Sequence, residues 1–487
     1  MEIIRSRIAV LTGAVLATAA AASADIAVGN AAEFAAAVSA STPAGQVVRL
    51  TKDIDLSGWA TCDFAGTVDG AGFTVSGLSS PLFGTLTGSV RNLTVAGSSI
   101  AGAEREECIG FFARKVRDTG AISGCTAAAD CTLTFAKQAN CHVGGIAGML
   151  EAATGDEGSA GTWITDCTNL AKIVCSAPDY NTRHGVGGIV GVVSNGVPCA
   201  SGVERCLNRG QFEIGTSCMG IGGIAGRLFC GGTAVDKSIV IADCRNESAI
   251  SHGKNDDTLA SRHFVAGGIV GGIGSANLVY YGTCEITRCA NYADVAAGDD
   301  ADTACATNRY AGGIVGRCEA LWKMAEVRVR DSANYGDVSG RFAGGFLGYM
   351  TMNMNYPASV VEFANCAGYG AVSWRASGAL AVGGTTEIAA SRTRTIDNCF
   401  FAAAASVPLV AGEDAGAYEA TGVVRSSDAG YSPEGAAAAL TAGAMDNGLS
   451  EWTAGALPDG TTPVPLLVPF CGRRRLAGSQ IIFRGWL

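Results

Sequence analysis

The sequence predicts an all-β protein, a right-handed parallel β-helix (β-solenoid) with a short N-terminal helical cap. A glycine-rich pentapeptide recurs along the chain, and a Cys-x-Asn-like element follows each copy, with Ser332-Ala333-Asn334 and Cys366-Ala367-Gly368 as its variants. Glycine makes up 68 of 487 residues, while 48% of residues are hydrophobic and only 16% are charged. This composition favours short buried strands joined by tight turns. Repeats of this size cannot bury their apolar side alone, so we expect them to stack into one rod.

Residues 1–24 carry the features of a signal peptide. Arg5 and Arg7 precede an apolar run over residues 8–22, and Ala22-Ser23-Ala24 has the small-x-small form of a cleavage site. We therefore expect cleavage after Ala24 and export to the cell surface or the medium. No later stretch is long and apolar enough to span a bilayer.

Residues 25–46 are expected to form the N-terminal cap. Asn30 precedes an alanine-rich segment and Glu33 stands at its third helical position, which is typical of a helix N-terminus. A cap is needed because the first coil would otherwise expose unpaired strand edges.

Residues 47–400 contain the repeats. The Gly-Gly-aliphatic-aliphatic-Gly element, with aromatic Phe346 in the last copy, is preceded by a degenerate copy at Gly110. Its six copies begin at Gly144, Gly187, Gly222, Gly267, Gly312 and Gly344. A Cys-x-Asn-like element follows each copy, so we interpret a repeat as two halves of about twenty residues. If each half is one coil, the rod has about 16 coils and is roughly 75 Å long.

Two residue types recur at fixed places in the second element, and both are expected to stack from coil to coil. The cysteines predict an inward ladder of mostly reduced thiols, since buried cysteine behaves as a small hydrophobe. They are Cys125, Cys167, Cys206, Cys244, Cys289, Cys366 and Cys399. The asparagines predict amide stacks at turns. They are Asn169, Asn208, Asn246, Asn291 and Asn334.

These residues, with the opening block from Lys52 to Val75, resemble the GLUG-motif proteins of bacteria over about residues 30–400. The resemblance implies an exported β-helix of an adhesin-like surface protein, without catalytic residues of its own. In related surface proteins the repeats can accompany a metallopeptidase domain, as in IgA-cleaving enzymes, but its zinc motif is absent from this sequence.

The charge balance and the metal-ligand residues exclude several function classes. The net charge is −10, so nucleic acid is not an expected partner. The 19 cysteines contain no CxxC pair, and the four histidines make no HExxH motif. We therefore expect no metal site and no cofactor.

Carboxylates are the residues that a polysaccharide-cleaving β-helix would need. Asp53, Asp55, Asp63 and Asp69 cluster in the opening block, where a structural role is favoured over catalysis or calcium binding. Asp256-Asp257 and Asp299-Asp300 are expected to be solvated loop charges.

Basic and aromatic residues precede four of the pentapeptides and could form one column that grips acidic glycans, although ordinary loop residues are the simpler interpretation. They are Arg183, His184, Arg262, His263, Arg309, Tyr310, Arg341 and Phe342. Cysteines bracket two pentapeptides, which suggests the disulfides Cys218–Cys230 and Cys305–Cys318.

Residues 401–487 are expected to close the other end of the rod, with a short helix around residues 440–445 and a proline-rich run after it. The sequence thus predicts an exported, non-catalytic protein that binds a glycan or a host or cell-surface protein through loops on the rod. A carbohydrate-active enzyme and a structural spacer remain as alternatives.

Overall fold

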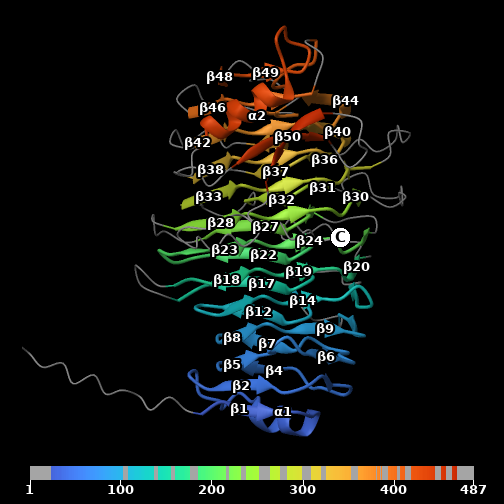
Figure 1. Ribbon diagram of the computed structural model, residues 1–487, viewed down its shortest axis with the longest axis vertical. Helices are drawn as coiled ribbons and strands as arrows, with labels where there is room; N and C mark the ends of the chain where they lie inside the picture. The colour runs from blue at the N-terminus through green and yellow to red at the C-terminus, as the bar shows by residue number, and fades with distance from the viewer. Residues whose placement is uncertain are drawn as a thin grey trace, which may run out of the picture.

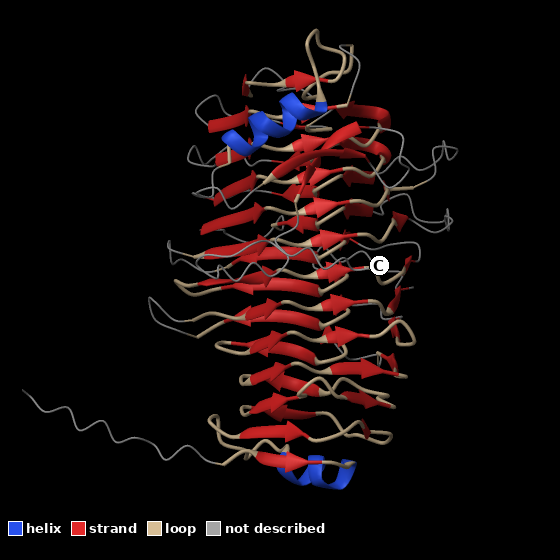
Figure 2. Ribbon diagram, viewed as in Figure 1, coloured by secondary structure: helices blue, strands red, loops and turns tan. Residues whose placement is uncertain are grey.

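The computed structural model is a rod of stacked strands that run across its long axis (Figures 1 and 2). It describes residues 24–102, 108–135, 141–154, 160–175, 185–214, 219–231, 237–251, 264–274, 282–298, 309–319, 325–351, 360–379, 381–383, 385–386, 393–402, 406–411, 418–444, 451–456 and 463–468. Five parallel sheets, named A to E here, run up the rod. The predicted parallel β-helix is confirmed.

Sheets A and B extend through the described length of the rod. Sheet A contains β1 (Ile26–Val28), β2 (Val47–Leu50), β5 (Thr67–Asp69), β8 (Ser89–Arg91), β13 (Ala121–Ser123), β18 (Trp163–Thr165), β23 (Ala200–Glu204), β28 (Ser238–Ala242), β33 (Gly282–Thr287), β38 (Ala325–Arg330), β42 (Val360–Ala364), β46 (Thr393–Asp397) and β48 (Glu419–Thr421). Sheet B contains β3 (Ile54–Asp55), β6 (Thr74–Ser76), β9 (Thr94–Ala96), β14 (Thr126–Ala127), β19 (Thr168–Asn169), β24 (Leu207–Asn208), β29 (Arg245–Asn246), β34 (Ala290–Asn291), β39 (Ala333–Asn334), β43 (Ala367–Gly368), β47 (Phe400–Phe401) and β49 (Val424–Arg425).

Sheets C, D and E complete the rungs. Sheet C contains β4 (Cys62–Phe64), β7 (Phe83–Leu86), β12 (Ala113–Arg117), β17 (Ala147–Ala152), β22 (Val190–Asn195), β27 (Ala225–Cys230), β32 (Val270–Ile273), β37 (Val315–Glu319), β41 (Leu347–Thr351) and β45 (Thr385–Thr386). Sheet D contains β10 (Ser99–Ala101), β15 (Thr132–Phe135), β20 (Lys172–Cys175) and β25 (Phe212–Ile214). The main run of sheet E contains β11 (Cys108–Ile109), β16 (His142–Gly144), β21 (Gly185–Gly187), β26 (Met219–Gly222), β31 (Phe264–Gly267), β36 (Arg309–Gly312) and β40 (Val338–Gly344). Strand β40 also pairs with β44 (Val372–Ala379) and with β35 (Val295–Ala296). Strand β35 in turn pairs with β30 (Ile250–Ser251).

The expected coil of twenty residues is correct only at the N-terminal end. Val48 lies beside Val68, and Val68 beside Val90, so the first two rungs are about that long and contain only strands of sheets A, B and C. From Val90 onwards the rung also passes through sheet E, with a strand of sheet D in the rungs of β10, β15, β20 and β25, and Ile241 lies beside Ile286, which is 45 residues later. The pentapeptide and the Cys-x-Asn element therefore belong to one rung.

The predicted number of coils is consequently wrong. Within residues 47–400, sheet A has eleven strands among the described residues, in place of the expected 16 coils. At about 4.8 Å per rung these eleven strands span roughly 50 Å.

Both predicted ladders are confirmed. The seven ladder cysteines are at most 2% exposed, and their Sγ atoms lie near the backbone carbonyl two residues earlier, as in Cys167 to Thr165 O at 3.2 Å. The five asparagines are fully buried, and the Nδ2 of each of the first four donates to the Oδ1 of the next at 2.8–3.0 Å, while Asn334 Nδ2 donates to Gly336 O. Each such bond satisfies a polar group that would otherwise be costly to bury.

The asparagine ladder explains the second glycine of the pentapeptide. A Cβ atom on Gly223 would overlap the side chain of Asn246 and the backbone oxygen of Gly268, and Gly188, Gly268 and Gly313 face their asparagines in the same way. The turn between sheets E and C therefore points inward and touches sheet B. A side chain at this glycine has no space.

At the degenerate copy that begins at Gly110, the large residue is on the turn and the small one is on sheet B. Ile109 lies beside Val143 and Ala113 beside Ala147, so the same offset places Phe111 where Gly145 stands in the next rung. In sheet B the corresponding change is Ala127 in place of Asn169. A large residue on the turn is thus matched by a small one on the sheet, which keeps the local volume filled.

A charged column on the corner between sheets A and B was not predicted. The residue before each ladder cysteine or serine has a positive φ in successive rungs: Asp166, Arg205, Asp243, Arg288 and Asp331. Opposite charges alternate there, and Arg288 forms two hydrogen bonds of 2.7 Å with Asp243.

The N-terminal cap is present as expected. Helix α1 (Ala31–Ala37) begins after Asn30, whose Oδ1 accepts a hydrogen bond from the backbone N–H of Glu33 at 2.9 Å. The helix packs Phe34 under the first rung, at one end of the rod (Figure 2).

The C-terminal part differs from the prediction. Strands β48 and β49 continue the rod, whereas helix α2 (Pro433–Ala442) and the antiparallel hairpin of β50 (Trp452–Ala456) and β51 (Pro463–Leu467) cover the outer side of sheet B (Figure 1). One apolar cluster joins Ala333, Tyr335, Ala367 and Phe400 to Leu440, Trp452, Val464 and Leu467. The described helix also starts earlier than expected, and Met445 lies outside the described residues.

Candidate ligand-binding face

Four of the eight predicted ligand contacts lie outside the described residues: Arg183, His184, Arg262 and His263. The other four lie on adjacent strands of sheet E. Arg309 and Tyr310 belong to β36, and Arg341 and Phe342 belong to β40. Tyr310 lies directly beside Phe342, so the structure brings these residues into one column.

The column lies along a seam in which the outer sides of sheets E and C pack against each other. Glycines allow this approach, since a Cβ atom on Gly185 would lie 2.8 Å from the side chain of Val192. Towards the C-terminal rungs larger side chains fill the same place. We call this part the E–C seam and define it by Arg227, Tyr310, Arg317, Glu319, Phe342 and Tyr349.

Ion pairs hold the deep part of the E–C seam. Arg227 Nη2 lies 3.1 Å from Glu319 Oε2, although the two residues are two rungs apart. Gly272 stands between them in register and leaves room for the arginine. Glu319 Oε1 also pairs with Arg317 Nη1 at 2.6 Å. Both carboxylate oxygens of Glu319 therefore face guanidinium groups.

Aromatic rings fill the rest of the E–C seam. Tyr310 stacks on Tyr349 with ring centroids 4.5 Å apart, and Phe342 meets Tyr349 edge to face at 4.9 Å. The Arg317 guanidinium lies 4.8 Å from the Tyr310 ring centre. Tyr310 is only 3% exposed, and this burial raises the pKa of its hydroxyl. At Tyr310 the predicted column therefore faces the interior, and the tyrosine ring contacts Tyr349 and Arg317.

The outer rim of the seam is more accessible. Arg341, Phe342 and Tyr349 are partly exposed, and Trp374 on the next strand is 38% exposed. Trp374 lies beside Gly340 in register, one residue before Arg341. Trp374 and Ile26 are the large hydrophobic residues that are exposed in the part of the chain that the structure describes. Sequence analysis missed Trp374 because it stands outside the repeated elements.

The four candidate carboxylates of the opening block all make local structural bonds. Asp53 accepts from Thr74 N at 2.8 Å and Asp63 from Thr85 N at 2.6 Å. Asp55 accepts from the hydroxyl and the backbone N–H of Ser57, and these bonds lower the pKa of its carboxyl group. A general acid would need a raised pKa.

Asp69 has a similar role with charged partners. Its Oδ2 lies 3.1 Å from Arg91 and 3.5 Å from Arg49, and its Oδ1 accepts from Ala71 N. Burial alone would raise the pKa of Asp69, but the bonds from Ala71 and Asn92 and the charge of Arg91 lower it. Asp256, Asp257, Asp299 and Asp300 lie outside the described residues.

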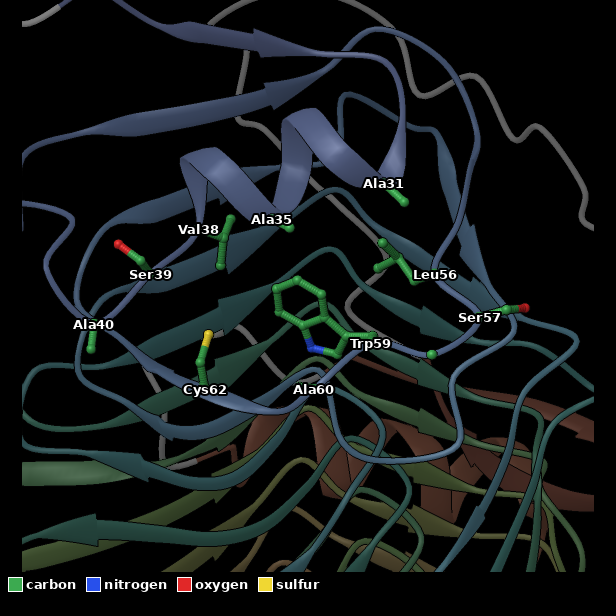
Figure 3. Close-up of a pocket in the computed structure, with 11 residues that line it drawn as sticks. Ala31, Ala35, Val38, Ser39, Ala40, Leu56, Ser57, Trp59, Ala60 and Cys62 are labelled. Carbon is green, nitrogen blue, oxygen red and sulfur yellow. The ribbon is translucent and has the colours of Figure 1, made fainter.

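A pocket of about 460 Å³ lies between α1 and the loop after β3 (Figure 3). Its lining is mostly apolar, with Ala35, Val38 and Leu56 around the ring of Trp59. Trp59 is held in place, because its Nε1 donates to Leu82 O at 2.8 Å and its ring meets Phe34 edge to face at 5.2 Å. The pocket thus marks the junction of the cap with the first rung.

The predicted disulfides are not formed between described residues. Cys230 and Cys318 are free, buried thiols, and their intended partners Cys218 and Cys305 lie outside the described residues. Both pairings stay predictions. Within the described ranges, no group of three or more His, Cys, Asp or Glu side chains could hold a metal ion, and no helix is long and apolar enough to cross a membrane.

Comparisons with known proteins add little to these observations. No model of a known protein family matches the chain, and no curated protein matches it. Among solved structures, the chain is similar to the crystal structure of "a putative immunoglobulin A1 protease from Bacteroides ovatus". The two are 16% identical over 91% of this chain and 92% of the other, with a TM-score of 0.31.

Proposed function

We propose that this protein is an exported, non-catalytic β-helix that binds a glycan or another extracellular partner along the side of the rod formed by sheets E and C. The observation that carries the proposal is the growth of the rung from 20 to 45 residues without loss of register in sheet A. The short rungs already stack, so a spacer would have no need of the longer ones.

In the sequence, the additional residues directly follow or precede strands of sheets C and E. In the middle of the chain they connect β27 of sheet C to β28 of sheet A, and they precede β31 of sheet E. Connections of a rigid scaffold are the usual place for binding residues. The strands that these connections join belong to the stacked rungs, and Arg227, Tyr310 and Glu319 of the E–C seam are buried.

Trp374 and Arg341 are the contacts that we propose for an acidic glycan. An exposed indole ring can stack on a sugar face, and a guanidinium group can bind a carboxylate with two hydrogen bonds. The engaged carboxylates of the opening block do not favour a glycosidase mechanism, which needs one carboxyl group with a raised pKa.

A glycan array with residues 25–487 tests the binding proposal. We expect binding to acidic glycans that falls at least about tenfold in Trp374→Ala and in Arg341→Ala, since each loses one principal contact. Lys172→Ala, an exposed cation on sheet D, is the matched control and should bind normally. Unchanged binding by both variants contradicts the assigned contacts. Shortening of a bound polysaccharide supports the enzyme alternative, and no binding supports the spacer.

Export is tested separately. Residues 1–24 lie largely outside the described residues, so the signal peptide stays a prediction. Fused to a reporter enzyme that is active only outside the cytoplasm, they should give activity, and the shortening of the fusion by cleavage should stop when Ala22 and Ala24 are replaced by bulky residues. An inactive wild-type fusion contradicts export.

A further inference from the structure

Two buried cysteines face each other across the corner between sheets C and A. Cys230 is the last residue of β27, and Cys284 is the third residue of β33. Their Sγ atoms are 3.9 Å apart, although the residues are 54 positions apart in the chain. Cys230 is 3% exposed and Cys284 is 5% exposed.

This pair differs from the cysteine ladder. Ladder cysteines occupy the same position in successive rungs, at the corner between sheets A and B, so equivalent residues stack there. A disulfide requires two Cβ vectors that converge. Cys230 and Cys284 come from different sheets and their Sγ atoms lie 3.9 Å apart, so a small movement brings them to bonding distance.

A positive charge lies next to Cys230. Lys237 is 2% exposed, and its Nζ donates to the backbone oxygen of Gly231, the residue after the cysteine. Desolvation lowers the pKa of Lys237, while the charge of a Cys230 thiolate would raise it. A neighbouring ammonium group stabilises a thiolate, which is the reactive form in thiol–disulfide exchange.

We infer that Cys230 and Cys284 are a redox pair that closes to a disulfide in an oxidising compartment. The co-reactant is a small or protein disulfide, such as oxidised glutathione. The Cys230 thiolate attacks one of its sulfur atoms and expels a thiolate, which takes up a proton. Cys284 then loses its proton and attacks Cys230 Sγ, expelling the second thiol. Two protein thiols are oxidised by two electrons, and one disulfide is reduced to two thiols.

The bond would join neighbouring rungs in the middle of the rod (Figure 1). Strand β27 leads into β28, and β33 is the next strand of sheet A above β28. The cross-link would therefore tie sheet C of one rung to sheet A of the next. This inference does not depend on the proposed binding function.

Peptide mapping without reduction tests the pair. The full chain is purified with reductant, equilibrated with mixtures of reduced and oxidised glutathione, alkylated and digested. We expect one cross-linked peptide pair containing Cys230 and Cys284, with a mass two hydrogens below the sum of the separate peptides. Cys284→Ser should abolish it, and Cys318→Ser, a buried thiol of the same region, should leave it unchanged.

Alkylation of the wild-type protein, unfolded in urea immediately after equilibration with glutathione, provides a second measurement that needs no variant, because unfolding exposes both buried thiols to the reagent. Oxidation should protect Cys230 and Cys284 together, at one midpoint of the glutathione ratio. A Cys230–Cys218 peptide, as the sequence spacing suggested, would overturn the inference. The inference would also be overturned if Cys230 and Cys284 both remained open to alkylation after the chain had been unfolded, refolded and oxidised for a long time.

Discussion

The first rungs and the later rungs share one wall of the core but are built differently. Val48, Val68 and Val90 are buried in one column of sheet A, and the column continues through Ile122 and Ile164 in the longer rungs. The first rungs close with sheets A, B and C. The later ones add sheets D and E and fold the Gly-Gly turn back onto sheet B. The comparison teaches that the repeat motif is the signature of this inward turn and not of the β-helix as such.

The largest effect is expected from a side chain on the inward turn. Gly223→Val should destabilise the middle rungs by at least about 3 kcal/mol, because its Cβ overlaps Asn246 and a backbone oxygen that cannot move away. Urea unfolding of residues 25–487 measures this loss. Gly45→Ala is the control outside the repeats, where nothing lies within 4 Å, and should change stability by less than about 0.5 kcal/mol. Similar losses in the two variants would disprove the packing argument.

Successive rungs carry Phe111 with Ala127 and then Gly145 with Asn169 at equivalent places, which predicts that these two positions are energetically coupled. Gly145→Phe alone should be strongly destabilising, whereas Gly145→Phe with Asn169→Ala should recover about 1–2 kcal/mol, because the double variant copies the preceding rung. A double-mutant cycle in urea gives the coupling energy. Additive losses would show that the two sites are independent, contrary to the comparison.

The charged corner between sheets A and B predicts a smaller effect that depends on burial. Arg288→Met should cost about 2 kcal/mol, since Asp243 is 7% exposed at its side chain and would lose both bonds. Arg205→Met, whose partner Asp166 is 52% exposed, should cost less than about 1 kcal/mol. Thermal unfolding of both variants at equal salt tests the order. A reversed order would mean that burial does not set the strength of these pairs.

The smallest effect concerns the first rungs. Because the pKa of Asp69 is lowered in the folded state, its charge stabilises the fold above the unfolded pKa, and this contribution is lost as the pH falls through the folded pKa. Asp69→Asn should therefore cost about 1 kcal/mol at pH 7 and progressively less as the pH falls below about 4, the unfolded pKa of an aspartate. Unfolding curves at a series of pH values measure the difference. A constant difference across this range would exclude the ionised carboxylate as its cause.

The sequence alone determined the parallel stack, the inward cysteines, the stacked asparagines and the helix that begins after Asn30. These are local or periodic properties, since equivalent residues of a stack meet their own copies in the next rung.

Only the tertiary structure decided which segments share a rung, where the C-terminal helix and hairpin pack, and that Tyr310 is buried in a seam with Arg317 and Tyr349. It also placed Cys230 beside Cys284. These contacts join different sheets across the section of the rod, and their partners depend on how far each turn folds inward. The spacing of residues along the chain does not determine how far a turn folds towards the core.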